Sequence, residues 1–104
     1  MSFKTKHWTA QIDRTPGNQS FRVNATVTVE DPRVLVRLEL STVQDNPFDL
    51  RLDLIISKPM DTALQGETEK LVTYKKMGDS NVTSVSIFYE GRPFFHIHRI
   101  LTTH

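Results

Sequence analysis

The sequence predicts an all-β fold, either a single antiparallel β-sandwich or a flattened small barrel of about seven strands. Apolar and polar residues alternate over several stretches, so that successive side chains would point to opposite faces of a strand. Turn-forming residues separate most of these stretches at regular intervals. The exception is Met60–Gln65, where the alternation stops and at most one short helical turn is expected before Gly66.

Length and composition indicate one globular domain over residues 1–104, because 38% apolar and 24% charged residues are ordinary values for a packed chain. The net charge of +1 gives no electrostatic reason to expect a nucleic-acid partner. The chain has no cysteine, which excludes disulfides, thiolate metal sites and cysteine nucleophiles. It also lacks an apolar run of signal-peptide or membrane-spanning length, so we expect a cytoplasmic location and no membrane association.

The first half of the chain predicts three strands. Phe3–Ile12 is the first, and the Asp13–Asn18 segment supplies turn chemistry after it. Phe21–Val29 has the clearest alternation in the protein. Asp31–Pro32 starts the next turn, and Val34–Leu40 continues the apolar face. A shift of one residue in the pairing would expose a whole set of valines and leucines, so the pattern determines which face is buried.

The second half predicts a fourth alternating strand over Phe48–Ile56, a short strand over Leu71–Met77, and a hairpin over Ser84–Leu101 followed by a tail. Charges of both signs on the outer faces of the third and fourth strands predict cross-strand pairing on a solvated surface. The side chains expected in the core are Trp8, Ile12, Phe21, Val23, Val27, Val29, Val34, Val36, Leu38, Leu40, Phe48, Leu50, Leu52, Leu54, Ile56 and Ile87.

The C-terminal hairpin is the most informative stretch, because both of its faces carry apolar side chains. Glu90–Gly91 is expected at the centre of a tight turn, where positive φ angles are needed. Regular pairing from this turn would place Val85 opposite His96. A hairpin with two apolar faces is either covered on both sides or meets a ligand, a second subunit or a partner.

His96 and His98 have metal-ligand character, because residues two apart on a strand share a face and both imidazoles could reach one ion. A zinc or iron site needs at least a third ligand, for which His7, Glu90 and His104 are the candidates. A metal-dependent enzyme that uses the two histidines is therefore one alternative function.

No catalytic residue and no cofactor is predicted from the remaining pattern. Ser84 and Ser86 are expected on the strand face opposite to the two histidines, so no pair of nucleophile and base is predicted. The chain has four glycines and none of them forms a glycine-rich phosphate loop.

The favoured hypothesis is a non-catalytic binding or assembly module, whose C-terminal hairpin contacts a protein partner or a second copy of the chain in a homodimer. A further alternative is a carrier of a small apolar ligand within the sandwich or barrel. The residues expected to contact the ligand or partner are Phe88, Tyr89, Arg92, Phe94 and Phe95.

Overall fold

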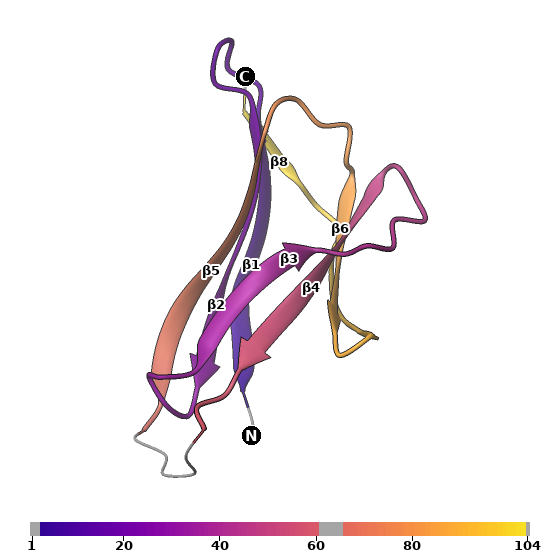
Figure 1. The fold of residues 1–104 in the computed structure, drawn as a ribbon. Helices are drawn as coiled ribbons and strands as arrows, with labels where there is room; N and C mark the ends of the chain where they lie inside the picture. Colours follow the sequence, from indigo (N-terminus) through magenta and orange to yellow (C-terminus); the bar gives the residue numbers. More distant parts are fainter. Residues whose placement is uncertain (1–2, 61–65, 104) are drawn as a thin grey trace.

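The computed structural model describes residues 3–60 and 66–103 of the chain. Within these ranges eight strands form two sheets of four, which pack face to face as a sandwich (Figure 1). The predicted all-β sandwich is confirmed, and the two separate sheets exclude the barrel alternative. The described ranges contain no helix that could cross a membrane. The helical turn predicted for Met60–Gln65 lies, apart from Met60, outside the described residues.

Each sheet contains both parallel and antiparallel neighbours, which corrects the expectation of purely antiparallel pairing. The parallel pairs are β1 with β8 and β4 with β6. Sheet A has the strand order β5 (Thr68–Met77), β2 (Ser20–Val29), β1 (Lys4–Asp13) and β8 (Leu101–Thr103). Sheet B has the strand order β3 (Leu35–Leu40), β4 (Asp49–Ser57), β6 (Ser84–Tyr89) and β7 (Arg92–Ile97).

The core lies between the sheets and follows the predicted alternation closely. Buried as expected are Ile12, Phe21, Val23, Val27, Val29, Val34, Leu38, Leu52, Leu54 and Ile87, while Trp8, Val36, Leu50 and Ile56 are partly buried against them. The core also contains Ala10, Ala25, Val72, Val85 and Ile97.

Two residues of the predicted core are instead exposed. Leu40 is 49% exposed and Phe48 is 55% exposed. Leu40 is the last residue of β3, an edge strand of sheet B, and Phe48 precedes the first residue of β4. The apolar alternation in the sequence therefore continues past the part of each strand that the opposite sheet covers.

The turn between β6 and β7 has the predicted centre. Glu90 has a φ of 50° and Gly91 a φ of 79°, the backbone that a tight primed turn requires, and Tyr89 pairs with Arg92 as in a two-residue loop. The pairing then shifts, because Ile87 lies opposite Phe95 while Phe88 lies opposite Pro93. Phe94 is therefore the extra residue of a β-bulge.

The bulge reverses the orientation of every side chain that follows it in β7. Val85 pairs with Ile97, and His96 pairs with Ser86, so the predicted pairing of Val85 with His96 is wrong. Ile97 points into the core and is 6% exposed, whereas His96 lies on the outer face of sheet B. A bulge is not visible in an alternating pattern, which is why regular pairing gave the opposite faces.

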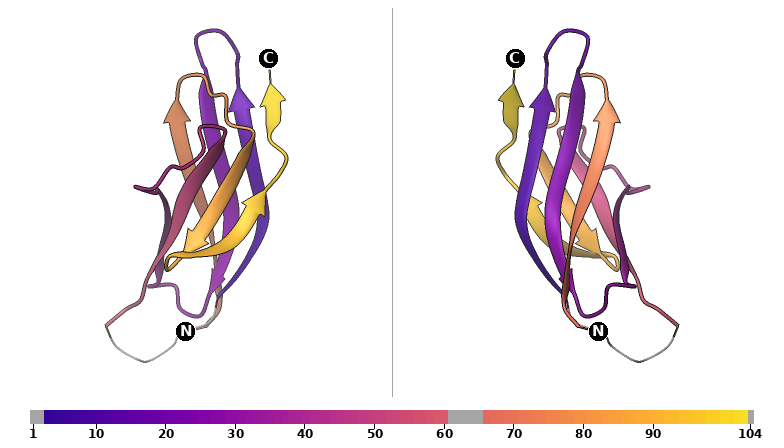
Figure 2. Two further views of the ribbon diagram at one scale, coloured as in Figure 1. Left: turned by 90° about the vertical axis from the view of Figure 1, so that its right-hand side faces the viewer. Right: turned by 90° about the vertical axis from the view of Figure 1, so that its left-hand side faces the viewer.

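The end of the chain passes from one sheet to the other. Residues 98–100 leave sheet B, and β8 then runs beside β1 in sheet A (Figure 2). Thr102 and Thr103, predicted as part of a tail, pair with Ile12 and Asp13. Because β8 has only three residues, it covers just the last part of the β1 edge.

A buried carboxylate holds the connection between β2 and β3, which joins the two sheets. Asp31 is fully buried, and its side chain accepts hydrogen bonds from the Arg33 backbone N–H at 2.8 Å, the Arg33 Nε at 2.9 Å and the second guanidinium nitrogen at 2.7 Å. Its carbonyl oxygen accepts a hydrogen bond from the Val34 N–H. Such a group is costly to bury unless its hydrogen bonds are satisfied, so this connection depends on them.

We expect Asp31→Asn to lower the free energy of unfolding by roughly 2–4 kcal/mol, because it removes the buried carboxylate charge that accepts the hydrogen bonds of the Arg33 guanidinium. The matched control is Glu39→Gln, whose ion pair with Arg37 lies on the surface and contributes about 1 kcal/mol or less. Denaturant unfolding followed by circular dichroism measures both. Equal losses in the two variants would contradict the role of the buried carboxylate.

Candidate functional site

An apolar groove lies between β1 and the chain that leaves β7. Its volume is about 400 Å³, and the residues that line it are Trp8, Thr9, Ala10, Phe95, His96, Ile97, His98, Arg99 and Leu101. Successive residues of both segments line it, whereas a sheet face would present only every second residue. The groove is therefore bordered by strand edges. We call it the β1–β7 groove.

Two aromatic rings meet in the β1–β7 groove. The rings of Trp8 and Phe95 stack with their centroids 5.5 Å apart and their planes at 18°. Trp8 Nε1 donates a hydrogen bond to Thr5 Oγ1 at 3.0 Å, which satisfies the polar end of the indole. His7 has a φ of 59°, and the pairing of β1 with β2 shifts at this point, so β1 is also irregular beside the groove.

The predicted contact residues do not lie together in the structure. Phe95 lies in the β1–β7 groove, and Arg92 is exposed at the start of β7. Tyr89 and Phe94 form an aromatic cluster with Phe3, with ring centroids 4.9 Å apart for Phe3–Tyr89 and 5.6 Å for Phe3–Phe94. Burial raises the pKa of the Tyr89 hydroxyl, and the charge of the neighbouring glutamate adds to this effect.

Phe88 belongs to a different surface from the other hairpin aromatics. It lies on the outer face of sheet B, where the guanidinium carbon of Arg51 stands 3.5 Å from the ring centroid. This cation–π contact takes up one face of the ring. The predicted contact set is therefore not one continuous patch, and Phe88 is not among the residues that line the groove.

Trp8 and Leu101 are groove residues that the sequence did not indicate as contact residues. Trp8 was expected in the core and Leu101 at the end of a regular hairpin. Leu101 is instead 59% exposed at the beginning of β8. Only the passage of the chain from sheet B to sheet A brings these residues near Phe95, and no local pattern encodes it.

A row of polar side chains crosses the outer face of sheet B beside the groove. Ser84 Oγ and Ser86 Oγ donate hydrogen bonds to the two carboxylate oxygens of Asp49 at 2.6 and 2.7 Å. Ser86 Oγ also lies 3.2 Å from His96 Nδ1. The rings of His96 and His98 follow, with centroids 4.4 Å apart. The expectation that Ser86 faces away from the histidines is wrong, because the bulge reverses the faces of β7.

This row contains the residue types of a Ser–His–Asp triad in the wrong order. In a triad the histidine lies between the other two, so that it takes the serine proton while the carboxylate orients its ring. Here Ser86 lies between Asp49 and His96, and its hydroxyl donates a hydrogen bond to the carboxylate. A serine that donates to a carboxylate is not activated for attack, so the row does not form a nucleophilic site.

The third ligand considered for the histidine pair is not provided by the described part of the chain. Within residues 3–60 and 66–103, no group of three or more His, Cys, Asp or Glu side chains is placed to hold a metal ion. His7 and Glu90 therefore do not complete a site with His96 and His98. His104, the remaining candidate, lies outside the described residues.

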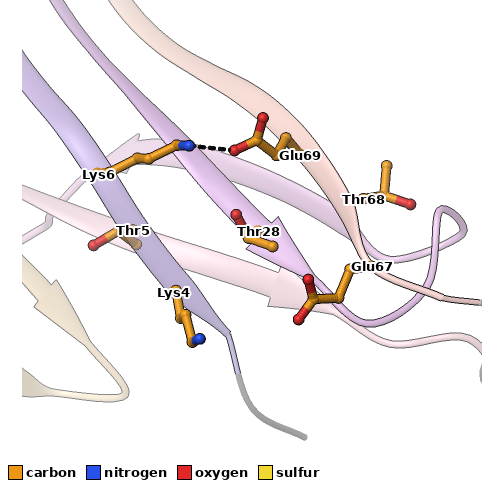
Figure 3. Close-up of a pocket in the computed structure, with 7 residues that line it drawn as sticks. All are labelled: Lys4, Thr5, Lys6, Thr28, Glu67, Thr68 and Glu69. Atoms are coloured by element: carbon orange, nitrogen blue, oxygen red, sulfur yellow. Dashed lines mark ion pairs between the residues drawn. The ribbon is translucent and has the colours of Figure 1, made fainter.

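A second pocket, of about 430 Å³, lies on sheet A near the starts of β1 and β5 (Figure 3). The ion pair between Lys6 Nζ and Glu69 Oε2 spans one side of it. The hydrogen bond from Lys6, and then its charge, lower the pKa of the Glu69 carboxyl. Both side chains are about half exposed. This pocket has the properties of a solvated charged surface, and we assign no function to it.

Comparisons of the chain with protein-family models, with curated proteins and with solved structures find no significant match. A function for this chain therefore has to be argued from its own residues.

The stacked pair in the groove gives a direct test of the geometry, because Trp8 is the single tryptophan of the chain. We expect Phe95→Ala to shift the fluorescence emission of Trp8 to longer wavelength and to increase its quenching by acrylamide, since the indole loses its cover. The loss of the stack and of apolar burial should cost roughly 1–2 kcal/mol of stability. The control is Phe88→Ala on the outer face, which should leave the emission of Trp8 unchanged.

Proposed function

We propose that this domain is a non-catalytic binding module, which takes up an extended segment of another protein along the free edge of β1. The observation that carries the proposal is the short reach of β8. It pairs with β1 only at Gln11–Asp13, and on that side no strand of the described chain pairs with Lys4–Ala10. An unpaired strand edge offers backbone N–H and C=O groups to an incoming strand.

The β1–β7 groove lies beside this free edge and supplies apolar contacts. Phe95 and Leu101 are 43% and 59% exposed, although both are large apolar side chains. In strand addition, backbone hydrogen bonds give affinity, while pockets that receive alternate side chains give specificity. A groove of this size accommodates a few apolar side chains of the bound segment.

The charge around the groove favours an acidic partner. Arg99 lines the groove, and no carboxylate does so in the described part of the chain. Complementary charge steers association and selects against partners of the same sign. The segment we propose is therefore extended, with apolar and acidic residues in alternation.

The same charge argument disfavours the homodimer as the main use of this edge. Two copies paired through their β1–β7 grooves would bring the Arg99 side chains of both chains together.

A carrier of a small apolar ligand is less well supported. Phe21, Leu52 and Ile87 are at most 2% exposed and fill the space between the sheets with their side chains. A ligand inside the sandwich would have to displace such residues, at the cost of their packing. The β1–β7 groove is open to solvent, as suits a polypeptide segment rather than an enclosed small molecule.

The test is a selection of random peptides displayed on phage against the folded domain. We expect the enriched peptides to alternate apolar and acidic residues, and to protect the amides of Lys4–Ala10 from hydrogen exchange when bound. Phe95→Ser and Leu101→Ser should each weaken binding by roughly ten- to a hundredfold, the equivalent of a lost apolar anchor. Trp8 fluorescence measures the affinity.

The matched control is Leu71→Ser, which removes another exposed apolar side chain, from β5 of the same sheet. It should leave the affinity unchanged. Proton–nitrogen spectra establish that each variant is folded. Peptides that bind Leu101→Ser as well as the unaltered domain, or that protect a different strand, would contradict the proposal. Dimers of bare chains in native mass spectrometry would instead support self-association.

A further inference from the structure

The two histidines at the end of β7 are close enough to share a ligand. The ring centroids of His96 and His98 are 4.4 Å apart, the planes are tilted by 36°, and both residues are exposed. A tetrahedral metal ion with nitrogen ligands at about 2.0–2.1 Å holds two such nitrogens roughly 3.4 Å apart. Rotation of the exposed His98 side chain can bring one of its ring nitrogens to this distance from a nitrogen of His96.

The hydrogen bonds around His96 favour the tautomer of the neutral imidazole that a metal ligand requires. The Ser86 hydroxyl donates its one hydrogen bond to Asp49. Toward His96 Nδ1, which lies 3.2 Å away, the Ser86 oxygen therefore acts as a hydrogen-bond acceptor. In the neutral imidazole this arrangement favours the proton on Nδ1, which leaves the lone pair of Nε2 for a metal ion. Histidine ligands in metal sites are oriented in this way, with the second ring nitrogen donating to a polar group that is itself hydrogen-bonded.

Ser84 completes this supporting arrangement. It donates to the other oxygen of Asp49 at 2.6 Å, so the carboxylate accepts a hydrogen bond at each of its oxygens. Asp49 belongs to β4, and Ser84 and Ser86 belong to the neighbouring strand β6. The backbone pairing of the two strands fixes their positions. The orientation of His96 therefore rests on the regular part of sheet B rather than on a loop.

We propose that His96 and His98 form a chelating site for one divalent transition-metal ion, with His96 oriented by Ser86 and Asp49. The chain supplies two imidazoles, since the described residues hold no group of three potential ligands, and water takes the remaining positions. Imidazole ligands favour copper, nickel and zinc over magnesium and calcium, which prefer oxygen. His96 and His98 also line the β1–β7 groove, so this proposal is tested on the domain without a bound polypeptide.

The test uses protein purified without an affinity tag and titrated with nickel, zinc or magnesium chloride. We expect nickel and zinc to bind with one ion per chain, and the imidazole signals of His96 and His98 to shift together in NMR spectra. Magnesium should produce no shift. H96Q and H98Q should each weaken nickel binding by about tenfold or more, because a single imidazole loses the advantage of chelation.

Two further variants separate the proposed site from unspecific binding. H7Q removes an exposed histidine on β1 and should leave the nickel affinity unchanged. S86A should weaken nickel binding by about tenfold, while S86T, which keeps the hydroxyl, should restore it. Equal effects of H7Q and H96Q, or a shift of one imidazole without the other, would overturn the chelate. An unchanged affinity in S86A would overturn the orienting role of Ser86.

Discussion

The burial of one face of each sheet against the other is the constraint on which the rest of this structure depends. In β7 the burial of apolar side chains conflicts with the pairing that the preceding turn sets. The Glu90–Gly91 turn sets the pairing of β6 with β7, and regular continuation would place His96 in the core and Ile97 in water. Burying an imidazole without partners is costly, and so is exposing isoleucine. The extra residue Phe94 resolves the conflict, because it reverses the faces after the turn.

The candidate sites follow from this single insertion. It places Phe95 on the inner side of sheet B, near its edge, where its ring stacks on Trp8. It places His96 on the outer side, beside Ser86. One irregular residue therefore gives the hairpin an apolar surface and a polar surface, which the alternating sequence alone could not separate.

The sequence was sufficient for those parts of the fold in which side chains alternate with a period of two. The core positions of β2 and β4 such as Val23, Val27, Leu52 and Leu54 were predicted correctly, because only one register buries them. The turn at Glu90–Gly91 was also correct, since few residues tolerate its backbone angles. Phe48 was misassigned, because an alternating pattern does not mark where coverage by the other sheet ends.

The candidate sites were less predictable, because they depend on pairings between distant segments. The two parallel pairs, β1 with β8 and β4 with β6, leave no local signal in the sequence. The contact residues predicted from the hairpin included Phe95 but not Trp8, which lies far away in the chain. The charged residues of β3 and β4 also do not make the cross-strand pairs that the sequence predicts. Arg37 pairs with Glu39 of its own strand, and Arg51 lies over an aromatic ring.

The meeting of β1 with β8 also has a consequence for the order of folding. Gln11 Nε2 donates a hydrogen bond to Thr103 Oγ1 across a separation of 92 residues. Contacts between such distant segments cost the most loop-closure entropy and give little return until the intervening strands are in place. The neighbouring pairs β1–β2, β3–β4 and β6–β7 need much shorter loops. The docking of β8 should therefore be a late event, so that the edge of β1 is still open over its whole length while the sheets assemble.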